Sequence, residues 1–238
     1  MQQYFTDELL SIGAEYIFTK EQAHHARDVV RLDHETIRLV DKENQGWFAV
    51  CESRGKEFIA KVTEKDESFN EPSIEITLCM ALIRREKFEL ILQKATELGV
   101  TKIVPFESSR CVVHAKKEKS DKQKQRYESI LLSAAEQCKR NIVPEITDVI
   151  DFKDITSAMS EVNLACYENA GRAARKISDF EITKSVSVVI GPEGGFSKEE
   201  MEELGAEGFE PVTLGPRILR AETAAFYALS VIGEGAME

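Results

Sequence analysis

The chain has 238 residues, of which 42% are hydrophobic and 31% are charged, and its formal net charge is −11. This length and composition predict a soluble globular protein with an ample core, arranged as one large domain or two modest ones. We expect no membrane span, because no run of eighteen apolar residues occurs, and the lack of a charged-then-apolar leader predicts a cytoplasmic location.

Residues 1–70 have the pattern of a small β-rich domain. Short apolar or alternating runs at 36–40, 47–51 and 58–62 are typical of strands, and turn residues separate them. Several short strands of this kind favour a barrel or a curled sheet. The stretch 21–32 predicts a helix that contains His24 and His25. One interpretation places one of these histidines in the core and the other on the surface, since no third ligand lies at metal-site spacing.

A polar stretch at 67–72 ends on proline and predicts a linker, so a second domain spans 73–238. Strand and helix signals alternate in it, which is typical of an α/β domain with a mainly parallel sheet. We expect strands at 74–83, 100–106, 145–150, 162–167, 185–190 and 209–214. Helices are expected at 88–98, where Gly99 provides a C-terminal cap, from Ser120 to a stop at 141–144, and at 222–232.

The five cysteines lie far apart in the sequence and form no CxxC pair. This spacing argues against both a zinc site and a disulfide framework. We therefore expect reduced thiols that are mostly buried, and no metal.

A glycine-rich stretch at 188–200 begins with a predicted buried strand. Gly191 to Gly195 then allow the backbone to take positive φ and to approach a ligand closely. Ser197 and Glu200 have the spacing of a capping box, so a helix should begin there. The stretch matches neither a P-loop nor a GxGxxG dinucleotide motif. By itself it is also compatible with a plain strand-to-helix turn.

A second stretch, at 214–224, carries two apolar residues where a loop is expected. Ile218 and Leu219 stand there between Arg217 and Arg220. Apolar loop residues usually cover something, so this pair either flanks a ligand or plugs the end of the sheet.

The two stretches together resemble the RsmE-like branch of the SPOUT methyltransferases. Segments at 94–100, 110–113 and 134–140, with Pro144, resemble family segments in the same order, whereas Gln3 stands where the family commonly has arginine. The resemblance implies an α/β fold: a C-terminal SPOUT-type trefoil-knotted parallel sheet in 73–238 and a small N-terminal PUA-like RNA-binding β-barrel in 1–70. It also implies methylation of N3 of a specific uridine in 16S ribosomal RNA, with S-adenosylmethionine as the methyl donor, on the assembled small subunit.

The resemblance also assigns the site by position. The cofactor-binding residues that the resemblance implies are Glu168, Gly191, Pro192, Gly195, Leu214, Gly215, Ile218, Leu219 and Ala224. Methylating uracil N3 requires a base or a stabiliser of the uracil anion, and the catalytic candidates are Arg220, Glu222 and Glu193, with Glu168 as a further possible base. A helix-dipole role for Glu222 and a turn role for Glu193 stay open.

Candidate RNA-binding residues combine a basic stretch after Cys111 with positions given by the resemblance. They are His25, Arg31, Arg110, Lys116, Lys117, Arg126, Arg140 and Arg217. Since the net charge of −11 repels phosphate backbones in general, RNA binding requires a polarised surface. The alternative interpretation of the basic stretch is a solvated helix flank.

The last predicted helix, 222–232, is too apolar to have a solvated side, and with the resemblance it predicts a homodimer. Two other functions stay open. One is a SPOUT enzyme that methylates another base or a ribose 2′-oxygen, and the other is a non-catalytic RNA-binding factor in ribosome assembly.

Overall fold

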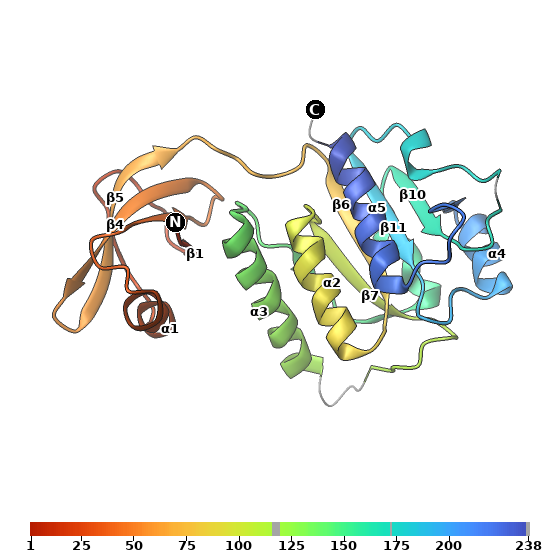
Figure 1. Cartoon of the computed structure of the whole chain (residues 1–238), viewed down its shortest axis with the longest axis horizontal. Helices are drawn as coiled ribbons and strands as arrows, with labels where there is room; N and C mark the ends of the chain where they lie inside the picture. The colour runs from red at the N-terminus through yellow and green to blue at the C-terminus, as the bar shows by residue number, and fades with distance from the viewer. Residues whose placement is uncertain (116–119, 172, 237–238) are drawn as a thin grey trace. The chain divides into compact units, whose positions relative to one another are not determined.

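The computed structural model describes residues 1–115, 120–171 and 173–236, so Lys116 and Lys117 lie outside the described residues. The chain divides into two compact units, one made of residues 1–71 with 135–142 and the other of residues 72–134 with 143–238. Each unit has its own hydrophobic core. Figure 1 shows the elements that make up both.

The described part of the first unit contains a five-stranded sheet in the order β1-β3-β4-β5-β2. All pairs are antiparallel except β1 with β3. The strands are β1 (Gln3–Phe5), β2 (Glu15–Ile17), β3 (Thr36–Val40), β4 (Gly46–Arg54) and β5 (Glu57–Asp66). A register shift between Phe48 and Ala49 marks a bulge in β4, which adds local twist. The three predicted strands and the predicted curled sheet are confirmed.

The predicted helix at 21–32 is α1 (Lys20–Ala23), which continues as a π-helix (His24–Val30) and ends at Arg31 with a left-handed φ of 63°. Both His24 and His25 are exposed, so the interpretation that one is a core histidine is wrong. The helix starts on the capping box of Thr19 and turns its Ala26 side inward. The ring of His25 instead pairs with the Tyr4 hydroxyl at 2.9 Å.

A buried polar cluster joins the sheet of the first unit to residues 140 and 141. The Arg38 guanidinium donates to Asp66 at 2.6 Å, to the Gln3 side-chain oxygen at 2.8 Å and to Asn141 at 3.0 Å. The Gln3 amide in turn donates to the Arg140 carbonyl at 2.7 Å. Gln3, which departs from the family pattern, is therefore an interior residue of this unit, 2% exposed.

In its described residues, the second unit contains a parallel sheet in the order β12-β10-β11-β6-β7-β8, with β9 also paired to β7. Its strands are β6 (Glu75–Ala81), β7 (Lys102–Glu107), β8 (Glu145–Ile146), β9 (Ile150–Asp151), β10 (Val162–Cys166), β11 (Ser185–Ile190) and β12 (Glu210–Val212). Its helices include α2 (Arg85–Glu97), α3 (Ser120–Cys138, as far as residue 134), α4 (Lys198–Ala206) and α5 (Ala221–Gly235), with 3-10 helices at Phe152–Ala158 and Ile177–Asp179. Figure 1 shows α2 and α5 side by side against the sheet.

The single strand predicted at 145–150 is wrong, because two short strands, β8 and β9, occupy that stretch. Ile103 pairs with Ile146 and Phe106 pairs with Ile150, so three residues of the edge segment face two residues of β7. One of those two is Pro105, which has no N–H to donate to a sheet ladder. The edge therefore bulges between the two pairings.

The cysteines and the glycine cap follow the sequence expectation. Cys51, Cys79, Cys111 and Cys166 are buried thiols, and Cys138 is half-buried. Gly99 follows α2 with a φ of +89°. No helix in the described ranges is long and apolar enough to cross a bilayer.

Candidate functional site

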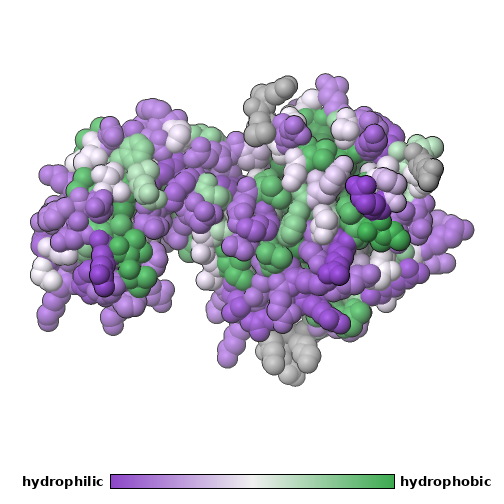
Figure 2. Space-filling model, in the orientation of Figure 1, coloured by the Kyte–Doolittle hydropathy of each residue, from purple (hydrophilic) through white to green (hydrophobic). Residues whose placement is uncertain are grey.

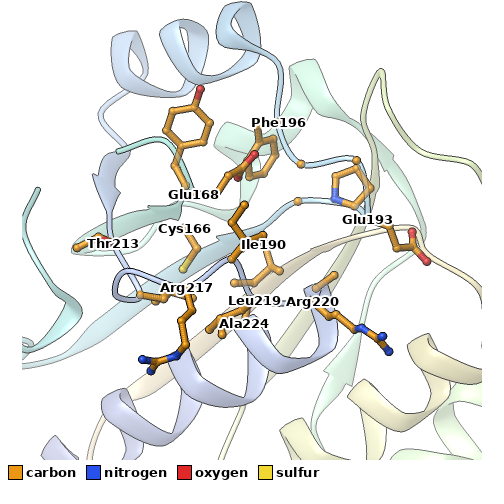
Figure 3. Close-up of a pocket in the computed structure, with 18 of the residues that line it drawn as sticks. Cys166, Glu168, Ile190, Glu193, Phe196, Thr213, Arg217, Leu219, Arg220 and Ala224 are labelled. Carbon is orange, nitrogen blue, oxygen red and sulfur yellow. The ribbon is translucent and has the colours of Figure 1, made fainter. Parts of the chain in front are cut away.

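The carboxyl ends of three neighbouring parallel strands, β12, β10 and β11, meet at one edge of the sheet in the second unit. The chain leaves β10 toward Glu168, leaves β11 into the loop Gly191–Phe196 and leaves β12 into the loop Thr213–Arg220. Ligands of open parallel sheets bind at such edges. Here the loops enclose a cavity of about 440 Å³ (Figure 3). The structure therefore brings the two sequence stretches together.

The loop Gly191–Phe196 depends on glycine at two positions. Gly195 has a φ of +65°, and a Cβ there would lie 2.5 Å from a carboxylate oxygen of Glu168. A Cβ on Gly191 would lie 3.1 Å from the Phe196 ring, which is itself buried. Without these side chains the main chain approaches both the cavity and its neighbours closely.

The same loop is held from behind by the turn that follows β7. The Arg110 guanidinium donates to the carbonyls of Gly194 and Phe196 at 3.2 and 3.1 Å. The buried Glu200 carboxylate accepts from the Ser109 N–H and from the Ser197 N–H, each at 2.8 Å. Ser197 and Glu200 form the predicted capping box of α4, which is confirmed. These bonds fix the loop before any ligand binds.

The loop Thr213–Arg220 has a different character, because its apolar side chains are open. Ile218 is 85% exposed, and Leu214 and Leu219 are half-buried. Ile218 therefore does not plug the end of the sheet. In Figure 2 hydrophobic surface lies beside strongly hydrophilic side chains over this loop, which precedes α5 in the sequence.

The cavity wall is apolar and its rim is charged. Cys166, Ile190, Leu219 and Ala224 line the wall, and burial raises the pKa of the Cys166 thiol to about 12, which keeps it protonated. The charged residues among the described lining residues are Lys87, Glu168, Glu193, Arg217 and Arg220. Figure 3 shows Arg217 and Arg220 extending in different directions away from the apolar wall.

Glu222, a predicted catalytic residue, is not among the described residues that line this cavity. Its carboxylate pairs with Lys87 at 3.2 Å and lies in the first turn of α5. Burial raises the pKa of Glu222, but hydrogen bonds from its own N–H and from Lys87, with the charges of Lys87 and Arg220, outweigh burial and lower it. A carboxylate with a lowered pKa is a poor base, so the structure favours the helix-terminus interpretation of Glu222.

The remaining predicted cofactor and catalytic residues all line the cavity. They are Glu168, Gly191, Pro192, Glu193, Gly195, Leu214, Gly215, Ile218, Leu219, Arg220 and Ala224. Gly194 lies within the predicted glycine stretch, and the lining residues that were not predicted are Lys87, Cys166, Tyr167, Ile190, Phe196, Thr213 and Ala221. Most of these flank a predicted strand end or loop, which is a usable signal, whereas Lys87 comes from a helix about a hundred residues earlier in the sequence.

The predicted RNA-binding residues separate into exposed and buried ones. His25, Arg31 and Arg217 are exposed, and Arg126 is exposed but paired with Glu89. Arg110 braces the glycine loop, and Arg217 lines the cavity. Lys116 and Lys117 lie outside the described residues.

The prediction that Arg140 binds RNA is wrong, because this residue is buried. It is 3% exposed, and its guanidinium donates to the Glu71 carboxylate at 3.0 Å. An interior ion pair of this kind cannot present its charge to an RNA backbone. Arg140 is therefore a structural residue of the first unit.

Comparison with known proteins places this fold and site in a family. Residues 70–233 match the model of the RNA methyltransferase domain. Small-subunit ribosomal RNA methyltransferase E of Bacillus subtilis is 34% identical over 98% of this chain and 96% of its own, and that of Mesomycoplasma hyopneumoniae is 36% identical over 90% and 92%.

Solved structures give the same result. The methyltransferase E of Neisseria gonorrhoeae bound to S-adenosylmethionine has a TM-score of 0.89 and 30% identity, covering 98% of this chain and 97% of that one. A methyltransferase of Legionella pneumophila, also with S-adenosylmethionine bound, has a TM-score of 0.88, 30% identity and coverage of 98% and 96%. These likenesses confirm the predicted SPOUT-type α/β fold class and the predicted enzyme class. The chain therefore belongs to the RNA methyltransferase family, in the branch of the small-subunit ribosomal RNA methyltransferase E proteins.

Proposed function

We propose that this protein transfers a methyl group from S-adenosylmethionine to N3 of a specific uridine in 16S ribosomal RNA, on the assembled small subunit. The observation that carries the proposal is the cavity at the carboxyl ends of β10, β11 and β12, which joins a glycine backbone, an apolar wall and a rim of arginines. Relatives with this fold are named for the same class of reaction, and two are solved with S-adenosylmethionine bound.

The residues around the cavity fit that cofactor. The loop Gly191–Phe196 lines the cavity, and Gly191 and Gly195 have no side chain to cover the main chain there, so its backbone groups can hydrogen-bond to the cofactor. Exposed Ile218 and half-buried Leu219 offer an apolar surface for adenine, and the Glu168 carboxylate can accept from an amine or a hydroxyl. When bound, S-adenosylmethionine supplies an electrophilic methyl group on a sulfonium.

The chemistry at uracil also requires a proton acceptor and a cation. Glu193 is the candidate base on this chain, because it lines the cavity and is exposed, unlike Glu222. Arg220 lines the same cavity from the residue before α5, and we assign it to the uracil or its phosphate. Orienting the uracil nitrogen and the methyl carbon in such a cavity supplies much of the reduction in the activation barrier.

Further RNA contacts, beyond the one proposed for Arg220, belong to the same proposal. We assign them to a PUA-like RNA-binding role of residues 1–70 through His25 and Arg31, and to Arg126, Arg217, Lys116 and Lys117 in residues 73–238, the knotted methyltransferase domain. The exposure of His25, Arg31, Arg126 and Arg217 supports this assignment. A 16S ribosomal RNA substrate also implies the cytoplasm.

A homodimer through α5 completes the proposal. Tyr227 on α5 is 48% exposed and Leu90 on the neighbouring α2 is 40% exposed, so this side of the unit offers apolar surface to a second copy. Light scattering at micromolar concentration should give twice the monomer mass of 26.8 kDa. A monomeric mass would count against it.

Nucleoside mass spectrometry tests the reaction itself. Small subunits that lack the modification are incubated with the protein and S-adenosylmethionine, and N3-methyluridine should appear in their 16S RNA. Methylation of another base or of a ribose 2′-oxygen would instead support the first alternative function. If calorimetry finds no binding of S-adenosylmethionine, the non-catalytic assembly factor becomes the better interpretation.

The role of Arg220 has its own test in the same assay. Arg220→Ala should slow methyl transfer by about 100-fold, the usual cost of removing one well-placed electrostatic group. Exposed Arg54, which pairs with Glu15 in the first unit, provides the matched control, and Arg54→Ala should keep the full rate. Full transfer by Arg220→Ala would remove this residue from the proposed mechanism.

A further inference from the structure

An ion pair between two helices stands at the edge of the cavity. Lys87 lies in the first turn of α2, and its ammonium is 3.2 and 3.3 Å from the two carboxylate oxygens of Glu222 in the first turn of α5. The two side chains are 31% and 14% exposed, so neither is a freely solvated surface group. Contact with both oxygens fixes the ammonium in place.

Of the two residues in this pair, only the cationic one is among the described residues that line the cavity. Lys87 is a lining residue, and Glu222, its partner, is not among the described lining residues. Glu222 keeps a lowered pKa despite burial, because its own N–H, Lys87 and Arg220 stabilise the carboxylate. The Glu222 carboxylate therefore holds the Lys87 side chain at the edge of the cavity.

We propose that Lys87 is a catalytic residue whose ammonium donates to a carbonyl oxygen of the target uracil and stabilises the anion formed when N3 loses its proton. Glu222 is then the residue that positions Lys87. This inference rests on the proposed function, since it concerns the nucleophile of that reaction.

The N3–H bond breaks and its proton passes to the Glu193 carboxylate or to water, which leaves a negative charge shared by N3 and the two carbonyl oxygens of uracil. N3 then forms a bond to the methyl carbon as the carbon–sulfur bond breaks, and the electron pair of that bond stays on sulfur. Lys87 loses no proton in the step; it lowers the free energy of the anion by charge and hydrogen bonding.

Lys87 suits this role better than the two arginines of the rim. Arg217 and Arg220 are exposed, so water screens their charges, whereas Lys87 is two-thirds buried and anchored on a helix. Lys87 pairs with Glu222, whose carboxylate the charge of Arg220 also stabilises, and the other charged residues among the described lining residues are Glu168, Glu193 and Arg217 on the loops. The nearest of these, Glu222, is the partner that fixes its ammonium.

The experiment compares Lys87→Met with Lys94→Met. Lys94 is the matched control, because it lies on the same helix, pairs with Glu97 at 2.8 Å and does not line the cavity in the described structure. Lys87→Met should slow N3 methylation of small subunits by about 100-fold at pH 7. Calorimetric affinity for S-adenosylmethionine should stay unchanged, and Lys94→Met should match the wild type in both measurements.

The pH profile separates this role from a structural one. Alkali removes the N3 proton without help, so the rate of Lys87→Met should rise about tenfold per pH unit and approach the wild-type rate above pH 9. Lys87→Met/Glu222→Gln, which leaves no unpaired buried carboxylate, should show the same loss and the same alkaline recovery. A wild-type rate for Lys87→Met, or a loss that does not shrink in alkali for the double variant, would overturn the inference.

The wild type is measured first, so the two proposals fail separately. If it forms no N3-methyluridine, the proposed function fails before any variant is compared. If it forms that product and the Lys87 variants do so equally well, only the role of Lys87 is lost.

Discussion

The polar cluster inside the first unit and the charged rim of the cavity in the second unit use similar residues in opposite ways. Arg38 and Arg140 are 2% and 3% exposed, and their guanidinium groups are bonded to Asp66 and Glu71. Arg217 and Arg220, in contrast, are exposed, and no ion pair of theirs is found among the described residues. The first pair of arginines is used by the fold, and the second pair is available to a ligand.

The physical reason for the difference is desolvation. A buried guanidinium loses its hydrogen bonds to water. It must replace them with hydrogen bonds to carboxylates, amides and carbonyls, which the first unit supplies. A rim arginine keeps its water until a ligand replaces it. Burial and partners therefore separate structural from functional arginines better than residue type does.

Arg140→Met should produce the largest effect in this comparison. Removing one partner of the buried pair leaves the Glu71 carboxylate buried without its cation, with only the N–H donors of Asn141 and Ile142, which should lower the free energy of unfolding by about 3–5 kcal/mol. Urea denaturation measures this, and Arg220→Met is the matched control with no expected change in stability. Equal stability of the two variants would break the distinction between the two sets.

Gly195→Ala should give the next largest effect, on the ligand rather than on the fold. At its φ of +65°, a Cβ would lie 2.5 Å from Glu168, so the loop or the Glu168 side chain must shift, and this change in the cavity should weaken the affinity for S-adenosylmethionine by about 100-fold. Calorimetry measures the affinity. Gly205→Ala in α4 is the control, since nothing lies within 4 Å of its Cβ position and it should bind normally. Normal binding by Gly195→Ala would show that the loop does not shape the cofactor site.

Glu136 tests the desolvation argument within the first unit through pH. Burial raises the pKa of Glu136 to about 7, against the Phe5 backbone hydrogen bond and the charge of Lys139. Because the pKa is raised in the folded state, stability is present below the ordinary value of 4.5 and is lost as pH rises to about 7. Glu136→Gln should therefore match the wild type at pH 4 and exceed it by about 2 kcal/mol at pH 8, after allowance for solvent screening.

The exposed Glu128 on the same helix is the control for that profile. Its replacement by glutamine should change stability little between pH 4 and pH 8, as followed by urea denaturation at each pH. A Glu136→Gln profile parallel to the wild type would mean that this carboxyl carries no burial cost.

Ile218→Ala should have the smallest effect. The side chain is 85% exposed, so its loss should leave the melting temperature unchanged while weakening S-adenosylmethionine binding by about 1 kcal/mol, or about fivefold. Ile12→Ala, at a site 68% exposed in the first unit, should change neither quantity. An unchanged affinity for Ile218→Ala would remove this residue from the adenine surface.

Much of the fold was predictable because its signals are local. Alternation and apolar runs located most strands, and the Ser197 and Glu200 spacing located the start of α4. The break between β8 and β9 was not predictable in the same way, because it depends on Pro105 in a neighbouring strand some forty residues away. Pairing decides such details, and a strand does not carry its partner in its own sequence.

The candidate site also has parts that local sequence signals predict and parts that depend on contacts between distant segments. The two cavity loops were recognisable from their glycine and apolar residues, and their assembly from the resemblance to a family. The wrong predictions concern residues whose surroundings are formed by distant parts of the sequence. Arg140 is buried against Glu71, Glu222 is paired with Lys87, and both histidines of the π-helix face solvent. Charge and residue type are visible in a sequence, whereas exposure and ion pairing are not.

The sequence by itself determined most of the strands, the capped helices, the glycine loop and the family of this protein, because these depend on short-range spacing and on the order of segments. Only the tertiary structure decided which charges are available for chemistry. Folding brought α2 against α5 and thereby set Lys87, rather than Glu222, at the cavity. A charge acts on a ligand only where folding leaves it without a sufficient partner or aims it at open space, and that is a property of contacts between distant segments.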